Sequence, residues 1–118
     1  MKEIKAFVRV TLLEEVVAGL SQAGFCCMSI IDVSGLGNLA DPKDSKYSLE
    51  FVQRTSKMAK IELACRDEEA DKAVEVIRTK GRSGDAGDGI IFVLPLEKAV
   101  KIRTGDTGDG ILQTQSGK

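Results

Sequence analysis

The feature that most constrains the fold is an order of segments that occurs twice along the chain. In each half, a β-forming stretch is followed by an amphipathic helical pattern and then by a second apolar stretch. The two halves are separated by a polar stretch of about twenty residues, which is long for a connection inside a compact domain. The predicted strands are 4–10, 26–33, 60–65 and 90–94, with a short fifth strand at 100–103.

The boundaries of the two predicted helices carry local signals. Thr11 is a predicted N-cap with Glu14 three residues later, the pattern of a capping box, and Gly24 is a predicted stop. The second helix begins near Asp67, where an acidic first turn suits the helix dipole, and ends near residues 78–80.

A doubled strand–helix–strand unit predicts an α+β, ferredoxin-like double βαβ fold. An antiparallel sheet of four strands then carries both helices on one face. The strands 26–33 and 90–94 are almost continuously apolar, which predicts burial on both faces. A single domain spanning residues 1–118 has no third layer to cover the open face, so we expect a homo-oligomer.

Composition excludes several functional classes. The formal net charge of −1 argues against nucleic-acid binding, because such binding depends on neutralising phosphates. No apolar run approaches the roughly 20 residues of a membrane span, so we expect no direct membrane insertion. The chain starts with an alternating segment rather than a signal peptide, which predicts a cytoplasmic protein.

The chain has three cysteines and no histidine. We expect neither a disulfide framework nor a metal site from this set. Cys26 and Cys27 lie on a predicted strand, where successive side chains point to opposite faces, so they should not share a metal. The favoured interpretation is that the cysteines are small buried hydrophobic residues in a reducing compartment, with redox or metal sensing as the alternative.

A ten-residue pattern occurs at 82–91 and again at 103–112. Each copy has Arg, Ser or Thr, then Gly-Asp-x-Gly-Asp-Gly and two aliphatic residues. Glycines can turn successive N–H groups into one anion-binding concavity, and an arginine adds bidentate phosphate recognition. The alternatives are two solvated acidic turns, or a calcium loop, although neither copy has the glutamate that ends an EF-hand loop.

Four motifs in order resemble the PII nitrogen-regulatory signal-transduction family, in a divergent PII-like branch. They are Val33-x-Gly35-x-Gly37, Lys60-Ile61-Glu62, the segment 83–93 (similar to the family's B-loop signature) and the segment 100–105 (similar to its C-terminal signature). The resemblance implies a homotrimer with a T-loop at about 38–57, a B-loop at about 81–89 and a C-terminal tail at about 104–118.

The resemblance also implies that an adenine nucleotide (ATP, ADP or AMP), with or without magnesium, binds between subunits. Ser29 and the backbone near Glu62 and Ala64 are expected at the adenine. The other expected contacts are Gly35 and Gly37 lining the cleft, the N–H groups of Gly87, Asp88 and Gly89 at the phosphates, and the cations Lys101 and Arg103, helped by Arg82 of the neighbouring subunit.

The departures from the family pattern are equally specific. Leu39 replaces a glutamine that helps hold magnesium and 2-oxoglutarate, and Met58 replaces the lysine that pairs with 2-oxoglutarate. Lys57 is adjacent but should point to the opposite side of the strand. Phe51 stands where some members carry a uridylylated tyrosine. Ile90 and Lys101 replace a lysine and an arginine of the nucleotide site. We therefore expect nucleotide binding without 2-oxoglutarate sensing or uridylylation.

The predicted T-loop carries Tyr47, Leu49 and Phe51 as candidate anchors for a protein partner. Some branches of the family accompany membrane transporters, which makes a transporter a candidate partner. The competing interpretation is that these side chains pack back onto the domain. Two other function classes stay open: a metal-responsive trimer like the ion-tolerance proteins, and a small phosphate-ester hydrolase. We do not expect an enzyme, because no nucleophile lies beside a general base.

Overall fold

The computed structural model describes residues 1–34 and 57–112. Its strands are β1 (Lys2–Arg9), β2 (Met28–Ser34), β3 (Lys57–Cys65) and β4 (Ile91–Pro95), and its α-helices are α1 (Leu13–Gln22) and α3 (Ala70–Gly81). Short 3-10 turns lie at η1 (Val10–Leu12), η3 (Asp67–Glu69) and η4 (Asp109–Ile111). Apart from Lys57, which begins β3, the predicted loop 38–57 lies outside the described residues.

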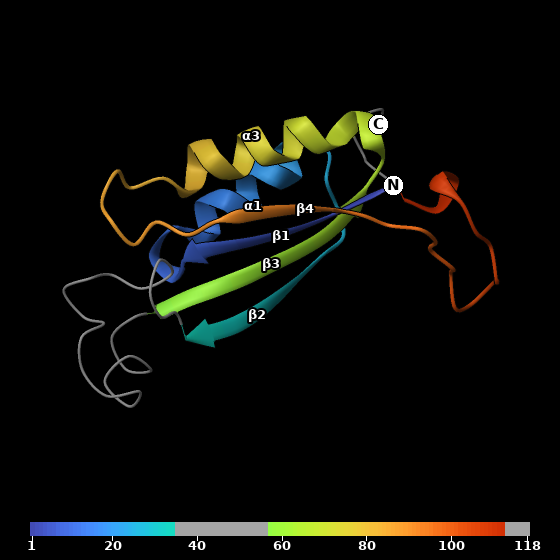
Figure 1. The fold of residues 1–118 in the computed structure, drawn as a ribbon, viewed down its shortest axis with the longest axis horizontal. Coiled ribbons are helices and arrows are strands. Elements are labelled where there is room, and N and C mark those ends of the chain that lie inside the picture. Colours follow the sequence, from blue (N-terminus) through green and yellow to red (C-terminus); the bar gives the residue numbers. More distant parts are fainter. Residues whose placement is uncertain (35–56, 113–118) are drawn as a thin grey trace.

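Within the described residues the strands form one sheet in the order β2-β3-β1-β4, and every neighbouring pair is antiparallel. Both α-helices lie on the same face of this sheet (Figure 1). This arrangement confirms the ferredoxin-like α+β fold that the doubled strand–helix–strand pattern predicts.

The hydrophobic core lies between the helices and the central strands. Ile4, Ala6 and Val8 alternate along β1 and are buried beneath the helices, and Ala6 lies opposite Ile61 of β3. The helices contribute side chains at helical spacing to the same cluster, namely Val16 and Leu20 of α1 and Ala70, Ala73 and Ile77 of α3. The burial of these apolar side chains holds the helices on the sheet.

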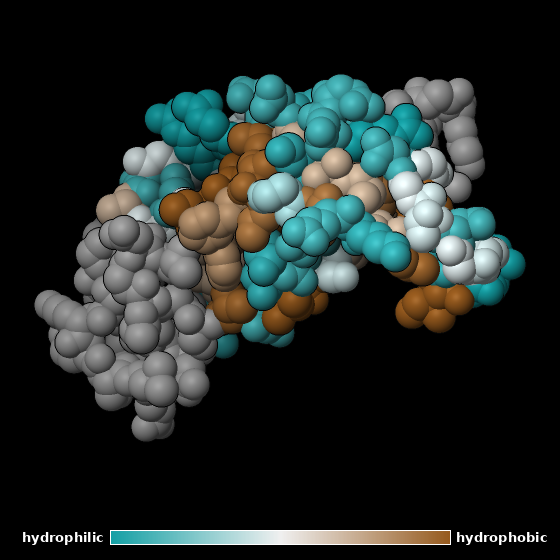
Figure 2. Space-filling view, turned by 45° about the vertical axis from the view of Figure 1, so that its right-hand side comes forward, coloured by the Kyte–Doolittle hydropathy of each residue, from teal (hydrophilic) through white to brown (hydrophobic). Residues whose placement is uncertain are grey.

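The outer strands leave apolar side chains exposed in the single chain. The helices cover β1 and β3, whereas β2 and β4 are the edges of the sheet. Ile31 is 40% exposed and Phe92 47% exposed in the single chain. Figure 2 shows hydrophobic side chains on the side of the sheet away from the helices. One chain therefore leaves an apolar sheet surface uncovered, and the expectation that an oligomer buries this second face stays a prediction.

Two local predictions are wrong. Thr11 is not the N-cap of a helix, because it lies inside η1, and Leu12 precedes α1 without a side-chain cap. The fifth strand at 100–103 is absent from the described residues; Val100 makes only an isolated bridge to Thr107. The chain reverses between them, because Gly105 adopts φ 77° and its N–H donates to the Lys101 carbonyl at 2.7 Å.

The expected placement of the cysteine pair is also wrong. Cys26 and Cys27 precede β2 instead of lying on it, so strand alternation does not separate their side chains. Their Sγ atoms lie 2.6 Å apart. Cys27 is exposed and Cys26 is half-buried, so of the three cysteines only Cys65 fits the interpretation of a small core residue.

Gly89 is required by packing, which gives a direct test of the fold. A Cβ at this position would lie 1.6 Å from the carbonyl oxygen of Phe7 on β1. We expect Gly89→Ala to lower the free energy of unfolding by about 1–3 kcal/mol or more, because the backbone must shift to relieve the overlap. Urea unfolding at fixed protein concentration measures this change.

Gly110→Ala is the matched control, because a Cβ there meets nothing within 4 Å. Equal unfolding midpoints for the two variants would contradict the close approach of Gly89 to β1.

Candidate functional site

The loop at 82–89, between α3 and β4, is organised by the side chain of Asp88. Its Oδ1 accepts hydrogen bonds from the Ser83 hydroxyl and from Arg9 Nε at 2.9 Å. Its Oδ2 accepts from the backbone N–H groups of Ser83 at 3.0 Å and Gly84 at 2.9 Å. Arg9 also donates from Nη2 to the Ala86 carbonyl at 2.8 Å. One carboxylate and one guanidinium therefore hold the loop against the end of β1.

These contacts decide the charge state of Asp88. Burial raises the pKa of its carboxyl, but hydrogen bonds from Ser83, Arg9 and the backbone of Gly84 and Ser83 outweigh burial and hold the pKa well below its usual range. The N–H of Asp88 lies 3.3 Å from the Asp85 carbonyl, which closes a turn inside the loop. Asp88 thus shapes the loop with its side chain, a role that the sequence analysis did not foresee.

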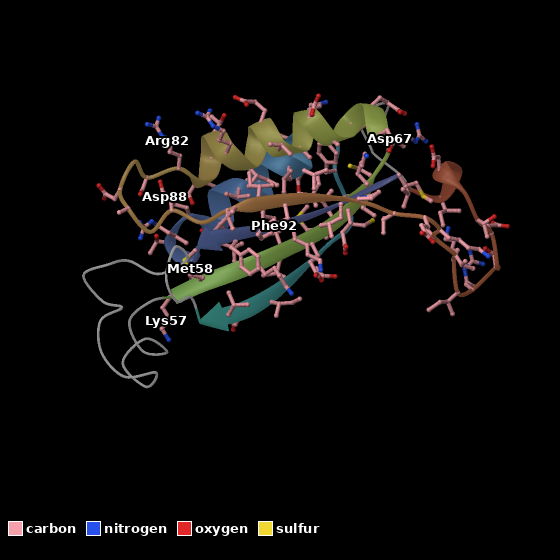
Figure 3. The ribbon with its side chains drawn as sticks, in the orientation of Figure 1. Lys57, Met58, Asp67, Arg82, Asp88 and Phe92 are labelled. Carbon is pink, nitrogen blue, oxygen red and sulfur yellow. The ribbon has the colours of Figure 1, made fainter. Side chains whose placement is uncertain are left out.

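A cavity of about 240 Å³ lies beside this loop. Arg82, Asp88 and Gly89 line it together with Phe7 of β1 and Ile90. Figure 3 shows Arg82 and Asp88 on the loop, with Met58 nearby at the start of β3. The structure therefore brings together three of the residues that the sequence analysis placed at the nucleotide phosphates. Arg82 was expected there from the neighbouring subunit, whereas here it lies beside Asp88 and Gly89 of its own chain.

The expected adenine residues lie on the sheet. Ser29 of β2 pairs with Glu62 of β3, and strand alternation puts both on the face away from the helices, together with the exposed Ala64. Glu62 Oε2 lies 3.5 Å from Lys60 Nζ and 4.0 Å from Lys5 Nζ. The carboxylate of Glu62 is therefore balanced by two lysines on the same face.

A second cavity, of about 260 Å³, lies at the opposite end of the sheet. Ala64 and Lys101 line it, together with Cys26 and Cys27. Arg103 is exposed in the turn that Lys101 opens. The two expected phosphate cations thus belong to the chain segment that follows β4.

The expected nucleotide residues do not meet at one place in a single chain. The loop at 82–89 lies at one end of the sheet, and the segment that carries Lys101 and Arg103 lies at the other (Figure 1). One chain therefore presents two separate groups of the expected nucleotide residues, which we call the two partial sites. Gly35 and Gly37, and the partner-binding candidates Tyr47, Leu49 and Phe51, lie outside the described residues.

Sequence reasoning missed two functional contributors to the loop. Arg9 is 79 positions from Asp88 along the chain, so no local motif links them. The backbone carbonyl of Phe7 lies directly against Gly89. The available signal was the alternation of β1, which puts Phe7 and Arg9 on the same face, but only the pairing of β1 with β4 brings that face to the loop.

Two kinds of feature are absent from the described residues. Within 1–34 and 57–112, no group of three or more acidic, cysteine or histidine side chains converges as a metal-binding set would. In the same ranges, no helix is long and apolar enough to cross a membrane.

The role of Asp88 predicts a pH-dependent loss of stability in Asp88→Asn. A lowered pKa in the folded state stabilises the protein at pH values above the unfolded-state value of about 3.9, and this contribution is lost as the pH falls through the folded-state pKa. We expect Asp88→Asn to lower the free energy of unfolding by roughly 1–3 kcal/mol at pH 7. The difference in free energy of unfolding between the variant and the unsubstituted protein should become smaller below about pH 4. Urea unfolding at pH 7 and pH 3 measures both.

Asp85→Asn is the control, since it removes the same charge from an exposed position of the same loop. Its effect should stay within about 0.5 kcal/mol, as for ordinary surface substitutions. A loss that is equal for the two variants, or independent of pH, would contradict the assigned role of Asp88.

Comparison with known proteins supplies the family. A family model described as nitrogen regulatory protein P-II matches residues 1–106. The chain is 36% identical over 107 residues to the nitrogen regulatory protein P-II of Microchaete diplosiphon, 36% identical over 107 residues to that of Pyropia yezoensis, and 37% identical over 103 residues to that of Rhodobacter capsulatus. Each alignment covers 87% of this chain and 92% of the relative. The chain belongs to the nitrogen regulatory protein P-II family.

Proposed function

We propose that this chain is a cytoplasmic signalling subunit that binds an adenine nucleotide between the subunits of a homotrimer and reports it to a protein partner. The observation that carries the proposal is the separation of the two partial sites in one chain. Residues with complementary roles at opposite ends of a protomer form one site when the end of one copy meets the opposite end of the next.

The loop at 82–89 supports the phosphate half of this site. Asp88 and Arg9 hold the loop in shape through contacts within the chain, so little conformational entropy would be lost on binding. Gly87 and Gly89 are the backbone positions that would turn N–H groups toward phosphate oxygens, and Arg82 is exposed on the same loop. Lys101 and Arg103 of a neighbouring copy would add the remaining positive charge.

The sheet supports the adenine half and the assembly. Ser29 and Ala64 are exposed on the face away from the helices, where an aromatic base would find polar and small side chains together. The same face exposes Ile31 and Phe92, and Phe92 packs edge-to-face against Phe7 with ring centroids 6.2 Å apart. Burying such apolar surface is a driving force for a trimer that joins the partial sites.

Loss of 2-oxoglutarate sensing is part of the proposal. Met58 is only 3% exposed, and its terminal methyl group lies 3.2 Å from where a Cβ on Gly89 would be, so this position offers an apolar contact beneath the loop instead of a cation. Lys57 is exposed and points away from Met58 (Figure 3). A 2-oxoglutarate dianion would then enter the cleft without a partner for its distal carboxylate, which is costly. Phe51 likewise offers no hydroxyl for uridylylation.

Calorimetric titration with ATP, ADP and AMP tests the nucleotide site. We expect at least one of them to bind, and Arg103→Ala to weaken binding by about 1–3 kcal/mol, or roughly 5–150-fold, because a charge-assisted phosphate contact is lost. Lys72→Ala, which removes an exposed cation from α3, should bind as the unsubstituted protein does. Light scattering on the same samples should give the mass of a trimer.

The same titration with ATP and magnesium is then repeated in millimolar 2-oxoglutarate. We expect the ATP affinity to change by no more than about threefold, whereas a coupling of about 1–3 kcal/mol would change it at least about fivefold. Absence of nucleotide binding to the trimer would refute the proposed function. A strong enhancement by 2-oxoglutarate would refute only the proposed loss of that response.

We further propose that Tyr47, Leu49 and Phe51 contact the partner, for which a membrane transporter is one candidate. A variant lacking Leu39 to Arg54 should keep its trimeric mass and nucleotide affinity but lose capture of a protein partner from a cell extract, because the apolar anchors are gone. Affinity capture with and without nucleotide, using both proteins as bait, measures this. Equal capture by the shortened variant would show that the segment is not the partner-binding element.

A further inference from the structure

Cys26 and Cys27 form a pair of neighbouring thiols that the proposed function does not use. Neither is in a disulfide, and their Sγ atoms lie 2.6 Å apart just before β2. Cys27 is exposed and Cys26 is half-buried in the single chain, so the rest of this chain does not enclose the pair. Cys65 lies at the same end of the sheet, at the end of β3, but it is buried in the core. The pair is therefore a dithiol that can react separately from the third cysteine.

The surroundings of the pair suit a small reagent. Both cysteines line the cavity of about 260 Å³ at this end of the sheet, next to Lys101. Lys101 is the charged side chain that lines this cavity, and its ammonium group favours the approach of an anion. A peptide disulfide that carries carboxylates, such as glutathione disulfide, has this charge and a sulfur that a thiol can attack.

We propose that Cys26 and Cys27 close reversibly into a disulfide by exchange with a small-molecule disulfide such as glutathione disulfide. The Cys27 thiolate attacks one sulfur of the reagent, its S–S bond breaks, and one glutathione leaves as a thiolate that takes up a proton. Cys26 then loses its proton to solvent and attacks the Cys27 sulfur, which releases the second glutathione. Two protein thiols are oxidised, and one glutathione disulfide is reduced to two glutathione molecules.

Geometry explains why closure is both accessible and reversible. The two Sγ atoms need to approach by only about half an ångström to reach the bonded distance of about 2.05 Å. The Cα atoms of adjacent residues are only about 3.8 Å apart, whereas disulfides usually join Cα atoms about 4.4–6.8 Å apart. The closed ring is therefore strained, and strained disulfides are readily reduced and serve as labile or regulatory bonds.

A metal chelate fits the pair less well than a disulfide does. Structural zinc sites take four ligands from cysteine, histidine or carboxylate side chains. In the described parts of the chain, no group of three or more such side chains comes together. Two sulfurs in contact, without a third ligand among the described residues, are better suited to bond to each other.

A change in the backbone at the cysteine pair would also act on the start of β2. Met28, the next residue, begins β2 and pairs with Leu63, which lines the same cavity. Closing the disulfide ring would constrain the backbone next to Met28, where the pairing of β2 with β3 begins. The inference stands on the dithiol alone and does not depend on nucleotide binding.

The test uses the full chain, reduced and then treated with glutathione disulfide at mildly alkaline pH. The alkaline condition is needed because the hydrogen bond with Cys26 raises the pKa of the Cys27 thiol, and the thiolate is the reacting form. Remaining thiols are alkylated with N-ethylmaleimide in denaturant before trypsin digestion. Trypsin cuts after Arg9 and Lys43 but nowhere between them, so both cysteines stay in peptide 10–43, while Cys65 is released in peptide 61–66.

We expect peptide 10–43 to be lighter by two hydrogen atoms and to carry no maleimide. Treatment with dithiothreitol before alkylation should restore both alkylation sites, and peptide 61–66 should be alkylated throughout. Cys26→Ser should instead stop at the mixed disulfide between Cys27 and glutathione, because the resolving thiol is missing. Cys65→Ala should close like the unsubstituted protein.

Three results would overturn the proposal, and each is read on the unsubstituted protein, so none depends on how a variant folds. They are a stable mixed disulfide with glutathione on peptide 10–43, a disulfide between two chains on a non-reducing gel, and two alkylated thiols after treatment with glutathione disulfide.

Discussion

The position of β1 at the centre of the sheet is the constraint on which the rest of the structure depends. It pairs with β3 on one side and β4 on the other, and its buried side chains form the floor beneath both α-helices. Its last residues also build the loop at 82–89, since the Phe7 N–H donates to the Ile90 carbonyl at 2.9 Å and Arg9 binds Asp88. One strand therefore joins the core, the sheet and the candidate phosphate loop into a single rigid unit.

The distribution of burial follows from the two α-helices and four strands that residues 1–34 and 57–112 form. The helices cover the middle of the sheet and leave its edges and its other face exposed. The segment after β4 extends this uncovered surface, and Ile102 within it is 100% exposed. Exposed aliphatic surface is unfavourable in water, so covering this segment with another molecule would be favourable. The proposed trimer would cover it together with the open face of the sheet.

The sequence predicted most of the fold because the fold rests on periodicity. Alternation in β1 and β3 and helical spacing in α1 and α3 placed the strands, the helices and the core residues close to where they are observed. Prediction from the sequence failed where a tertiary contact overrides a local signal. Thr11 and Glu14 have the spacing of a capping box, yet the chain passes from β1 directly into a 3-10 turn. Val100 to Arg103 are good strand formers, yet a hydrogen-bonded turn at Gly105 prevents a strand.

Only part of the candidate site could be predicted from the sequence. The glycine-rich motif located the loop, but the partner that holds it, Arg9, lies 79 positions away along the chain. The cysteine pair was assigned to a strand, and a shift of the strand start to Met28 was enough to reverse the inferred geometry of its thiols. A separation between two partial sites is a property of the folded chain, and no motif spacing encodes it.

The edge position of β2 has a consequence for how the protein reaches its native state. Among the described residues, no strand pairs with the outer edge of β2, which also exposes Ile30 and Ile31. Such an edge can pair with the wrong strand of another chain. Asp32, exposed on the same strand, places a negative charge in this edge and disfavours stacking with an identical copy. Refolding yield should therefore depend on how far edge-to-edge aggregation is suppressed, and this carboxylate is one group that opposes it.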